Sequence, residues 1–426
     1  MYNKCYKEVI CVQRPKGTLD VYGLEGKLYD YLYEYTSNFM KLYNYDFIKL
    51  PTFEYTELFY RGVGSTTDVV NKETYDFVDK GGRNITLRPE FTAGVVRSYI
   101  ENKLYVDGVS KFYYFGSAFR YERPQSGRLR EFTQFGVEAF GIKNPYFDAE
   151  IINLAYKYLS GLNITDLKVY INTLGDNESR NNYNKVIKEY LEKDYDNLCD
   201  TCKERLNKNP LRILDCKYDS DREYIKNAPK IIDYINDESK KYYEKVKEAL
   251  TLLDIPFEED KTLVRGLDYY SHTVFEIKSN LEFLGKANTL LAGGRYDTLV
   301  ETLGGPATPA MGFAAGIERI MTVLAELEAY VPTNEVDIFV MNLSGNAYAY
   351  QIVDDLRNSG FIVETDYTGK NIKGLWKLVD KFNPAYILIV GEDEEMGAYV
   401  TVKCASTKEE VKVKASELLE YLDMNI

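Results

Sequence analysis

The stretch FYYFGSAFRYERPQSGRLREFTQFGVEAFG, residues 112–141, decides the fold of this chain. Aromatic and β-branched residues at 111–121 and 132–141 alternate with period two on either side of a polar loop. This pattern has no helical stripe and predicts two antiparallel strands. Because alternate side chains of a strand share one face, small and polar residues gather on one face of each strand: Gly116, Ala118 and Arg120, then Gln134, Gly136 and Glu138.

The small residues on these faces indicate a ligand pocket on the sheet. Glycine and alanine beside Arg120, and glycine between Gln134 and Glu138, leave a hollow with a backbone floor and a polar rim. Such hollows are typical of ligand sites. The alternative is a surface hairpin whose charges form salt bridges. The small neighbours argue against a core role and favour the pocket.

The segments around this hairpin extend the sheet and add helices. Apolar residues at three- and four-residue steps predict a helix at 24–44, and 147–160 also has a helical pattern. Residues 45–59 have a strand-like composition, interrupted by Pro51, whose missing N–H places it at a strand edge or a subunit contact. Two further strands are expected, at 83–88 and 166–174.

Two shifts in composition divide the rest of the chain. Residues 176–260 are rich in Lys, Glu, Asn and Tyr with helical spacing, and predict a helical insertion. From Pro332 onward strands alternate with helices, which predicts a separate α/β domain. Its acidic run, 392–395, is expected to be a solvated loop. The expected domains are 1–175 together with 261–328, then 176–260, then 331–426.

Length and composition narrow the class of protein. The chain has 426 residues, 45% of them hydrophobic and 28% charged, which is typical of a globular protein of several domains. No apolar run reaches the ~20 residues of a membrane span and no apolar signal segment is visible, so we expect a cytoplasmic protein without a membrane partner. The net charge of −13 gives nucleic acid no global attraction, although it does not forbid local basic grooves.

A single histidine, His272, restricts the catalytic chemistry. A zinc site built on paired histidines, or a Ser–His–Asp triad with a spare base, would have to use this one residue. We interpret His272 as a packing or surface residue rather than as a catalyst.

Three of the six cysteines lie in the expected insertion: Cys199, Cys202 and Cys216. In a chain without a secretory signal they indicate reduced thiols rather than disulfides. The Cys-x-x-Cys spacing suggests zinc, but three thiols without a local fourth ligand leave a tetrahedron incomplete. We therefore interpret them as ordinary thiols and expect no metal ligand among the protein side chains.

Four arginines beside glycine or in polar loops predict a triphosphate site: Arg120, Arg128, Arg265 and Arg319. Guanidinium groups bind phosphate oxygens and stabilise the charge that develops in an in-line displacement. Gly312 and Gly316 precede Arg319 at a strand-to-helix junction, which indicates either free N–H groups for an anion or close strand–helix packing. The chain has neither a GxxxxGK[ST] nor a GxGxxG motif, so a P-loop and a dinucleotide fold are excluded.

Five motifs carry a family resemblance: TLRPEFT (86–92), FRYERPQSGRLREF (119–132), LVRGLDYY (263–270), AGGRYD (292–297) and GFAAGIERI (312–320). With them the chain resembles the histidyl-tRNA synthetases, class II aminoacyl-tRNA synthetases of bacterial type. The resemblance extends from RPKGTLD, near Arg14, to the C-terminal domain. The pair LVRGLDYY and AGGRYD is what points to histidine within class II.

The resemblance implies a fold and an activity. The fold is an α+β catalytic domain with a mainly antiparallel sheet, a helical insertion, and a C-terminal α/β anticodon-binding domain. The activity is ATP-dependent formation of histidyl-adenylate from L-histidine, followed by transfer to the 3′ end of tRNA(His). ATP with Mg²⁺ is the implied cofactor pair. A homodimer is also implied, with the first helix, Pro51 and its strand at the contact.

The resemblance also assigns roles to residues. Arg120 is expected to bind the ATP α-phosphate, and Arg265 to lie between that phosphate and the substrate carboxylate. Arg128 and Arg319 are expected to hold the β/γ end with Mg²⁺. The expected histidine-binding residues are Glu90, Thr92, Gln134, Glu138, Arg265, Tyr269, Tyr270 and Tyr296, with Glu138 and Tyr270 on the two imidazole nitrogens.

One departure and two alternatives accompany the resemblance. Relatives usually read EFHQ where this chain has EFTQ; Thr133 faces away from Gln134, so we expect little effect on substrate binding. A regulatory paralogue that binds histidine without charging tRNA usually lacks the C-terminal domain and the ATP arginines, and this chain has both. A class II synthetase for glycine, proline or threonine conflicts with the LVRGLDYY and AGGRYD pair.

Overall fold

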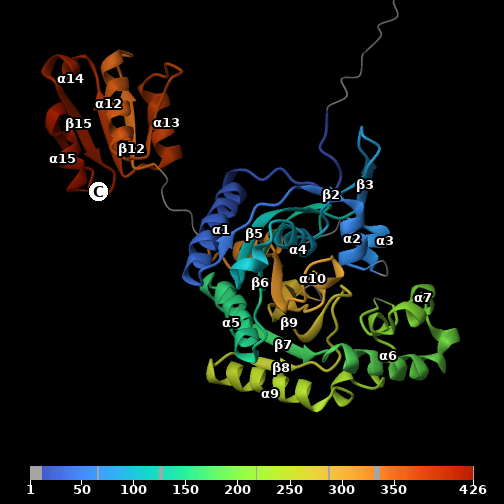
Figure 1. The fold of residues 1–426 in the computed structure, drawn as a ribbon. Helices are drawn as coiled ribbons and strands as arrows, with labels where there is room; N and C mark the ends of the chain where they lie inside the picture. Colours follow the sequence, from blue (N-terminus) through green and yellow to red (C-terminus); the bar gives the residue numbers. More distant parts are fainter. Residues whose placement is uncertain are drawn as a thin grey trace, which may run out of the picture. The chain divides into compact units, whose positions relative to one another are not determined.

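The computed structural model describes residues 12–64, 67–123, 128–216, 218–285, 288–330 and 336–425. These residues form two compact units that divide after Tyr330 (Figure 1). Pro332, expected to open the second domain, lies outside the described residues. Among the helices that are described, none combines the length and the apolar character needed to cross a lipid bilayer.

An eight-stranded sheet forms the centre of the first unit (Figure 1). Its strand order is β1-β5-β6-β11-β10-β9-β7-β8. The pairs β1–β5 and β7–β8 are parallel, and the other neighbours are antiparallel, which confirms the mainly antiparallel sheet. The strands are β1 (Asp46–Phe47), β5 (Ser110–Phe119), β6 (Glu131–Phe140), β7 (Leu167–Thr173), β8 (Phe257–Glu259), β9 (Ser271–Ser279), β10 (Thr289–Arg295) and β11 (Ala310–Gly316).

A three-stranded antiparallel sheet leads the chain into the large one. Its order is β2-β4-β3, and three short helices accompany it. After β4 the chain passes through Glu90 into α4, which brings the TLRPEFT motif to the large sheet. These elements are β2 (Phe53–Tyr55), β3 (Tyr75–Val78), β4 (Asn84–Leu87), α2 (Thr56–Gly62), α3 (Asp68–Lys72) and α4 (Thr92–Glu101).

Helices bury both faces of the large sheet. One face packs in a common core with α1 (Gly23–Leu42), α5 (Pro145–Gly161), α9 (Asp237–Leu252) and α11 (Ile317–Glu326). The other packs with α4 and with α6 (Asn177–Glu192), α7 (Asp200–Lys208), α8 (Glu223–Lys226) and α10 (Leu299–Thr302). Alternation along β6 explains the division, because Phe135 and Val137 belong to the first core and Phe140 to the second.

The segment 45–59, expected to be strand-like, is only partly so. It contains the short strands β1 and β2, but α2 begins at Thr56. Phe59 and Val63 lie four residues apart on one helical face and are buried against Ala93 of α4. This helical spacing determines the local structure more strongly than the β propensity of the aromatic residues.

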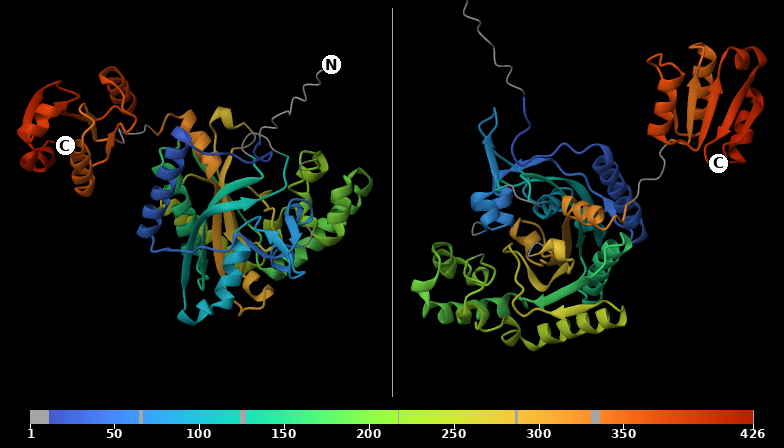
Figure 2. Two further views of the ribbon diagram at one scale, coloured as in Figure 1. Left: turned by 90° about the horizontal axis from the view of Figure 1, so that it is seen from above. Right: turned by 180° about the vertical axis from the view of Figure 1, so that it is seen from behind.

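Residues 176–260, expected to be a helical insertion, contain helices and one strand of the large sheet. The helices α6 and α7 lie at the periphery of the first unit in both views of Figure 2. Helix α9 packs along α5, and β8 then pairs with β7 at the sheet edge. The segment thus leaves the sheet after β7 and returns to it with β8.

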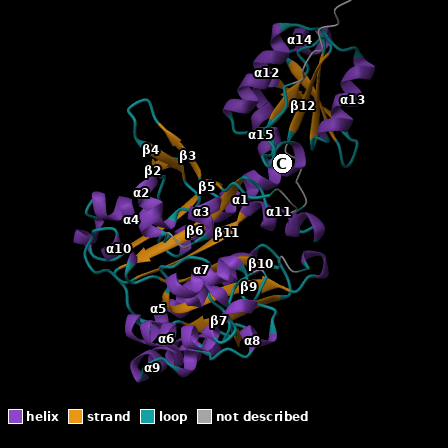
Figure 3. Ribbon diagram, turned by 90° about the vertical axis from the view of Figure 1, so that its right-hand side faces the viewer, coloured by secondary structure: helices purple, strands orange, loops and turns teal. Residues whose placement is uncertain are grey.

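The second unit is a five-stranded sheet with helices on both faces (Figure 3). The order is β13-β12-β14-β15-β16, in which β13, β12 and β14 are mutually parallel and the pairs β14–β15 and β15–β16 are antiparallel. Ile338 and Val340 of β12 pack in one core with α12 and α15, whereas Phe339 and Met341 pack with α13. The elements are β12 (Ile338–Asn342), α12 (Ala347–Asn358), β13 (Val363–Thr365), α13 (Ile372–Phe382), β14 (Tyr386–Val390), α14 (Glu392–Gly397), β15 (Tyr399–Cys404), β16 (Glu410–Lys414) and α15 (Leu418–Asp423).

The acidic run 392–395 was expected to be a loop, and this expectation is wrong. It forms the first turn of α14. The Glu394 carboxylate accepts the Gly391 N–H at 3.0 Å and the Thr401 hydroxyl at 2.9 Å. Acidic side chains at a helix start also interact favourably with the positive end of the helix dipole.

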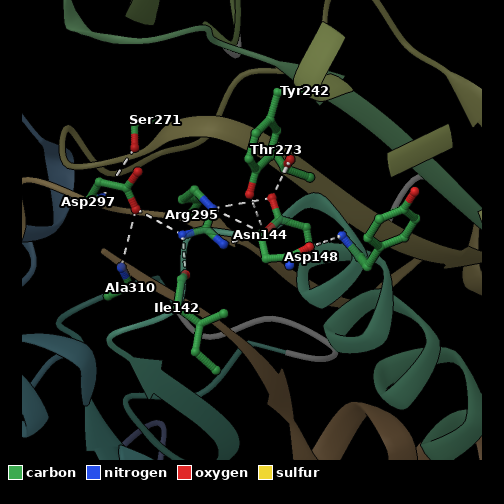
Figure 4. Close-up of polar contacts among 10 residues, drawn as sticks. Ile142, Asn144, Asp148, Tyr242, Ser271, Thr273, Arg295, Asp297 and Ala310 are labelled. Carbon is green, nitrogen blue, oxygen red and sulfur yellow. Dashed lines mark hydrogen bonds and ion pairs between the residues drawn. The ribbon is translucent and has the colours of Figure 1, made fainter. Parts of the chain in front are cut away.

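A buried ion pair lies beside the AGGRYD motif (Figure 4). The fully buried Arg295, at the end of β10, donates from Nε to both carboxylate oxygens of Asp148 in α5, at 3.1 and 3.2 Å, and from Nη2 to the same carboxylate. The hydroxyl groups of Thr273 in β9 and Tyr242 in α9 also donate to Asp148, at 2.7 and 3.0 Å. The ion pair therefore connects two strands and two helices.

The same guanidinium reaches a third strand. Its Nη1 donates to the Ile142 carbonyl at 2.9 Å and to the Asp297 carboxylate at 3.0 Å. Asp297 in turn accepts the N–H of Ala310, which begins β11, at 3.2 Å. Because buried charges are tolerated only when they are paired and hydrogen-bonded, this network specifies how the elements meet.

Asp148→Asn should therefore destabilise the first unit by about 3–5 kcal/mol, because it leaves the buried Arg295 charge without its carboxylate. The matched control is Glu57→Gln, which breaks the exposed Arg61 pair and should cost less than about 1 kcal/mol. Urea unfolding followed by circular dichroism measures the change. The only tryptophan, Trp376, lies in the second unit, so its fluorescence transition should not shift. Equal losses in the two variants would contradict the role of the network.

Candidate active site

An inner cavity of about 160 Å³ opens on the face of the large sheet that carries Gln134 and Glu138. Nine residues expected in the site from the sequence line it together: Glu90, Thr92, Arg120, Gln134, Glu138, Arg265, Tyr269, Tyr270 and Tyr296. They come from the start of α4, from β5 and β6 with their loop, from the loop 263–270 and from the end of β10. The structure thus gathers residues that lie far apart in the sequence.

Glu138 lines this cavity from the second half of β6. Its carboxylate accepts hydrogen bonds from the Thr92 hydroxyl, at 2.6 Å, and from the Tyr296 hydroxyl. Gly312 is its register partner in β11, and a Cβ at that position would collide with the carboxylate. The first glycine of the GFAAGIERI motif, Gly312, is therefore required because the Glu138 side chain leaves no room for a Cβ.

The electrostatics of the inner cavity favour neutral carboxyl groups. Burial, assisted by the nearby charge of Glu90, raises the pKa of Glu138 to about 8, even though Thr92 and Tyr296 donate to it. Burial also raises the pKa of Glu90, although this carboxylate accepts the backbone N–H groups of Thr92 and Ala93 at 2.6 and 2.9 Å. A ligand that brings positive charge or N–H donors would stabilise both carboxylates in their ionised form.

The loop 263–270 supplies a second cation of the inner cavity beside Arg120. Arg265 forms an ion pair with Glu276 of β9. Burial alone would lower the pKa of Arg265, but the Glu276 carboxylate and the hydroxyl groups of Tyr270 and Tyr269 together outweigh it, and the pKa is raised. The Nε of Arg265 is buried without a hydrogen-bond partner among the described residues, so the guanidinium keeps a free donor.

An outer cavity of about 240 Å³ adjoins the inner one. Arg128 and Arg319 line it, and Arg120 and Gln134 line both cavities. All four arginines expected from the sequence are thus brought together, three of them around the outer cavity. Residues 124–127 of the loop before Arg128 lie outside the described residues.

Each outer arginine is anchored by one protein acceptor. Arg120 donates from Nε to the Pro89 carbonyl at 2.9 Å, and Arg319 donates from Nη1 to the Thr289 carbonyl at 2.6 Å. Arg128 donates to the Glu122 carboxylate at 3.1 Å. Burial and the positive charge of Arg128 lower the pKa of Arg319. Guanidinium groups held close together in this way favour a polyanionic ligand.

Gln134 stands between the two cavities with an unsatisfied acceptor. Its Oε1 is buried and accepts no hydrogen bond from the described residues. Because buried acceptors are normally paired, this amide oxygen indicates a ligand with an N–H donor at the junction.

Two residues discussed from the sequence lie outside both cavities. Thr133 faces away from Gln134, where its N–H donates to Glu318 at 2.7 Å and its hydroxyl hydrogen-bonds Tyr29 at 3.3 Å. His272 is buried in β9 with its ring 5.4 Å from that of Tyr242. Burial lowers the pKa of His272, which favours a neutral packing residue.

One cavity residue and one residue behind the cavity wall were not recognised in the sequence. Tyr114 lines the inner cavity and stacks on Phe91 at 4.2 Å between ring centroids. It lies on the same face of its strand as Gly116, so strand alternation was the available signal. Glu276, the partner of Arg265, had no comparable signal because it occupies another strand.

An antiparallel sheet with this arginine-lined pair of cavities, followed by a separate α/β unit, defines a class II aminoacyl-tRNA synthetase. The family model for histidyl-tRNA synthetase matches residues 18–320, and that for the anticodon binding domain matches residues 336–425. The chain belongs to the histidyl-tRNA synthetase family. The family and fold class expected from the sequence are thereby confirmed.

Individual relatives agree over nearly the whole length. The histidine–tRNA ligase of Bacillus cytotoxicus is 45% identical over 416 residues, which cover 96% of this chain and 98% of the relative. That of a Geobacillus species, strain WCH70, is 46% identical over 415 residues with the same coverage. The apo crystal structure of S. aureus histidyl-tRNA synthetase has a TM-score of 0.84 at 37% identity, covering 96% of this chain and 99% of that chain.

The raised pKa of Glu138 predicts a pH-dependent stability. The folded chain holds this proton up to a pH of about 8, whereas the unfolded chain releases it near 4.5. The free energy of unfolding therefore falls through this group as the pH rises between these values. From pH 5 to 8.5 the wild type should lose roughly 2–4 kcal/mol more than Glu138→Gln, which has no proton to retain.

Urea unfolding at the two pH values, without ligands, measures this difference. The control Glu326→Gln changes an exposed carboxylate on α11 and should retain the wild-type dependence. Parallel stability curves for the wild type and Glu138→Gln would contradict the prediction.

Proposed function

We propose how the residues of this chain carry out the reaction of its family, the joining of L-histidine to tRNA(His). The family assignment makes the chain a histidine–tRNA ligase, and this activity uses ATP. The observation that carries the residue assignment is the pair of adjoining cavities. The inner one is lined by carboxylates and phenols, the outer one by arginines, and both share Arg120 and Gln134.

The inner cavity holds the amino acid. Glu138 and Tyr270 hydrogen-bond the two imidazole nitrogens, while Tyr269 and Tyr296 complete the pocket. The ammonium group binds among Glu90, Thr92 and Gln134, where the unsatisfied Oε1 of Gln134 supports this placement. Selectivity follows because a side chain without ring nitrogens would leave buried polar groups unpaired. Each unpaired group would weaken binding by about 1–3 kcal/mol.

The outer cavity holds ATP. Arg120 binds the α-phosphate, and Arg128 and Arg319 bind the β/γ end. Bound Mg²⁺ would neutralise part of the triphosphate charge, and the Glu122 carboxylate in the same cavity offers the oxygen ligands that this ion prefers. The adenine ring lies over the sheet near Phe132, whose ring is 5.3 Å from the Arg120 guanidinium.

The reaction needs no protein nucleophile. A carboxylate oxygen of histidine attacks the α-phosphorus, the bond from that phosphorus to pyrophosphate breaks, and histidyl-adenylate forms. Arg265, with its free Nε donor, lies at the edge of the inner cavity and stabilises the charge at the reacting centre. The acyl group then passes to the terminal ribose of tRNA. Positioning and charge stabilisation carry the first step.

The remaining partners are a second copy of the chain and the tRNA. Phe47, Phe53 and Tyr55, which flank Pro51, expose about half of their side chains and support a homodimer contact at this segment. The second unit matches the anticodon-binding family and binds the tRNA through a local basic patch at Lys370, Lys373 and Lys377. A patch of this size neutralises few phosphates, so the salt dependence of binding is modest.

ATP–pyrophosphate exchange, measured with each of the twenty amino acids, tests the proposal. Exchange should depend on histidine alone, because only an imidazole satisfies Glu138 and Tyr270 together. No exchange with any amino acid, combined with histidine binding, would instead indicate the regulatory paralogue. Exchange with glycine, proline or threonine would contradict the assignment of the inner cavity.

Arg265→Ala should reduce histidine-dependent exchange by about 10²–10³-fold or more, because it removes the cation from the reacting centre. Since Glu276 then keeps only Lys278 and Thr289 as partners among the described residues, thermal melting must show that the variant is folded. The control Arg83→Ala removes an exposed arginine paired with Asp79 and should leave exchange unchanged. Near-normal exchange in a folded Arg265→Ala variant would refute the assigned role.

A further inference from the structure

Three thiols and one carboxylate meet in the segment between α6 and α9: Cys199, Cys202, Cys216 and Asp219. One ligand atom from each lies within 4.8 Å of all the others. The sulfur atoms of Cys199 and Cys216 are 3.7 Å apart. Zinc–sulfur bonds of about 2.3 Å place two sulfurs of a tetrahedron roughly 3.8 Å apart, so the cluster has the dimensions of a single metal site.

We propose that Cys199, Cys202, Cys216 and Asp219 bind one zinc ion that stabilises this segment. The sequence alone offered three thiols and no fourth ligand. The structure supplies it, because the turn after Cys216 brings the Asp219 carboxylate to the thiols. Each pair of ligands is separated by two residues, the spacing common in structural zinc sites.

The fourth ligand has the burial expected of a metal-bound carboxylate. The Asp219 side chain is fully buried. Its Oδ2 accepts the Cys199 N–H at 3.0 Å, while its Oδ1 accepts no hydrogen bond from the described residues. A buried carboxylate oxygen normally has a donor or a cation. Arg222 lies 3.2 Å from Oδ1 but is itself partly exposed, which leaves this oxygen available to an ion on the thiol side.

The surroundings suit the charge of the occupied site. Three thiolates and one carboxylate carry four negative charges, of which Zn²⁺ neutralises two. Arg222 offsets part of the remainder. Cys199 is the N-cap of α7, so the positive end of this nine-residue helix faces the cluster. The Tyr218 N–H donates to the Cys216 sulfur at 3.5 Å, a contact that orients a sulfur ligand.

A redox pair of cysteines is the competing interpretation. The 3.7 Å between sulfurs is well beyond the ~2.05 Å of a disulfide bond. Soft sulfur ligands in a small tetrahedral site favour zinc over magnesium or calcium.

The site also bears on the active-site loop. Its ligands bracket α7 and the residues that follow, among which Asn209 donates to the Asp268 carboxylate at 2.7 Å. Asp268 belongs to the loop 263–270, which carries Arg265. The ion therefore holds together the segment against which this loop packs.

The zinc content of the full chain tests the proposal independently of its catalytic activity. Protein purified under reducing conditions and dialysed against a chelating resin should retain about one zinc ion per chain, measured by mass spectrometry of the metal. Cys202→Ser and Asp219→Ala should lose most of it. The matched controls are Cys404→Ser, a thiol of the second unit, and Asp221→Ala, an exposed acid two residues from Asp219; both should retain the metal.

Two further measurements cover variants that fold poorly. Cobalt added to the reduced, metal-stripped wild type should give the thiolate-to-metal charge transfer and visible bands of a tetrahedral sulfur site. Asp219→Cys, which supplies a fourth thiolate, should retain zinc at least as firmly as the wild type. A reduced wild-type chain that retains no zinc and gives no cobalt spectrum would overturn the proposal. A disulfide between two of the three cysteines in a purified chain without metal would also overturn it.

Discussion

The ion pair between Arg295 and Asp148 is the interaction on which the first unit depends. Both side chains are fully buried, and they join β10 to α5 while their hydrogen bonds reach β9, α9 and β11. Paired charges in an apolar interior contribute modestly to the net free energy of unfolding. A buried charge that has lost its partner, in contrast, strongly destabilises the folded state. Alternative packings of these elements are therefore disfavoured. The next residue, Tyr296, donates to Glu138, so the same constraint reaches the floor of the inner cavity.

The two cavities differ in the charge of the ligand that each one favours. In the inner one, burial opposes ionisation of Glu138 and Glu90, and the site is most stable when a ligand supplies donors to them. In the outer one, three guanidinium groups lie close together and are most stable around an anion. Each cavity is thus electrostatically incomplete alone. Because Arg120 and Gln134 line both, ligands in the two cavities would lie next to each other.

Much of this architecture could be predicted from local pattern. Strand alternation placed Gln134 and Glu138 on one face, and they line the same cavity because β6 is regular. Features that depend on residues distant in the sequence could not be predicted. The Arg295–Asp148 pair spans 147 residues, and neither residue type signals burial in advance. Local pattern also failed at two places. A helix begins at Thr56, because the helical contacts of Phe59 outweigh the β propensity of the segment. Asp219 reaches the thiols through a turn that its sequence neighbours do not reveal.

The insertion is part of the first unit in physical terms, although its helices α6 and α7 lie at the periphery. Arg180 of α6 donates to the backbone carbonyls of Tyr270 and Asp268, at 2.9 and 2.8 Å. Asn209 holds the Asp268 side chain. The loop that carries Arg265 is therefore fixed from two directions by residues of the insertion. A loop fixed in this way holds the Arg265 guanidinium ready at the inner cavity without reorganisation. In the reaction proposed above, charge preorganised in this way is what stabilises a transition state most effectively.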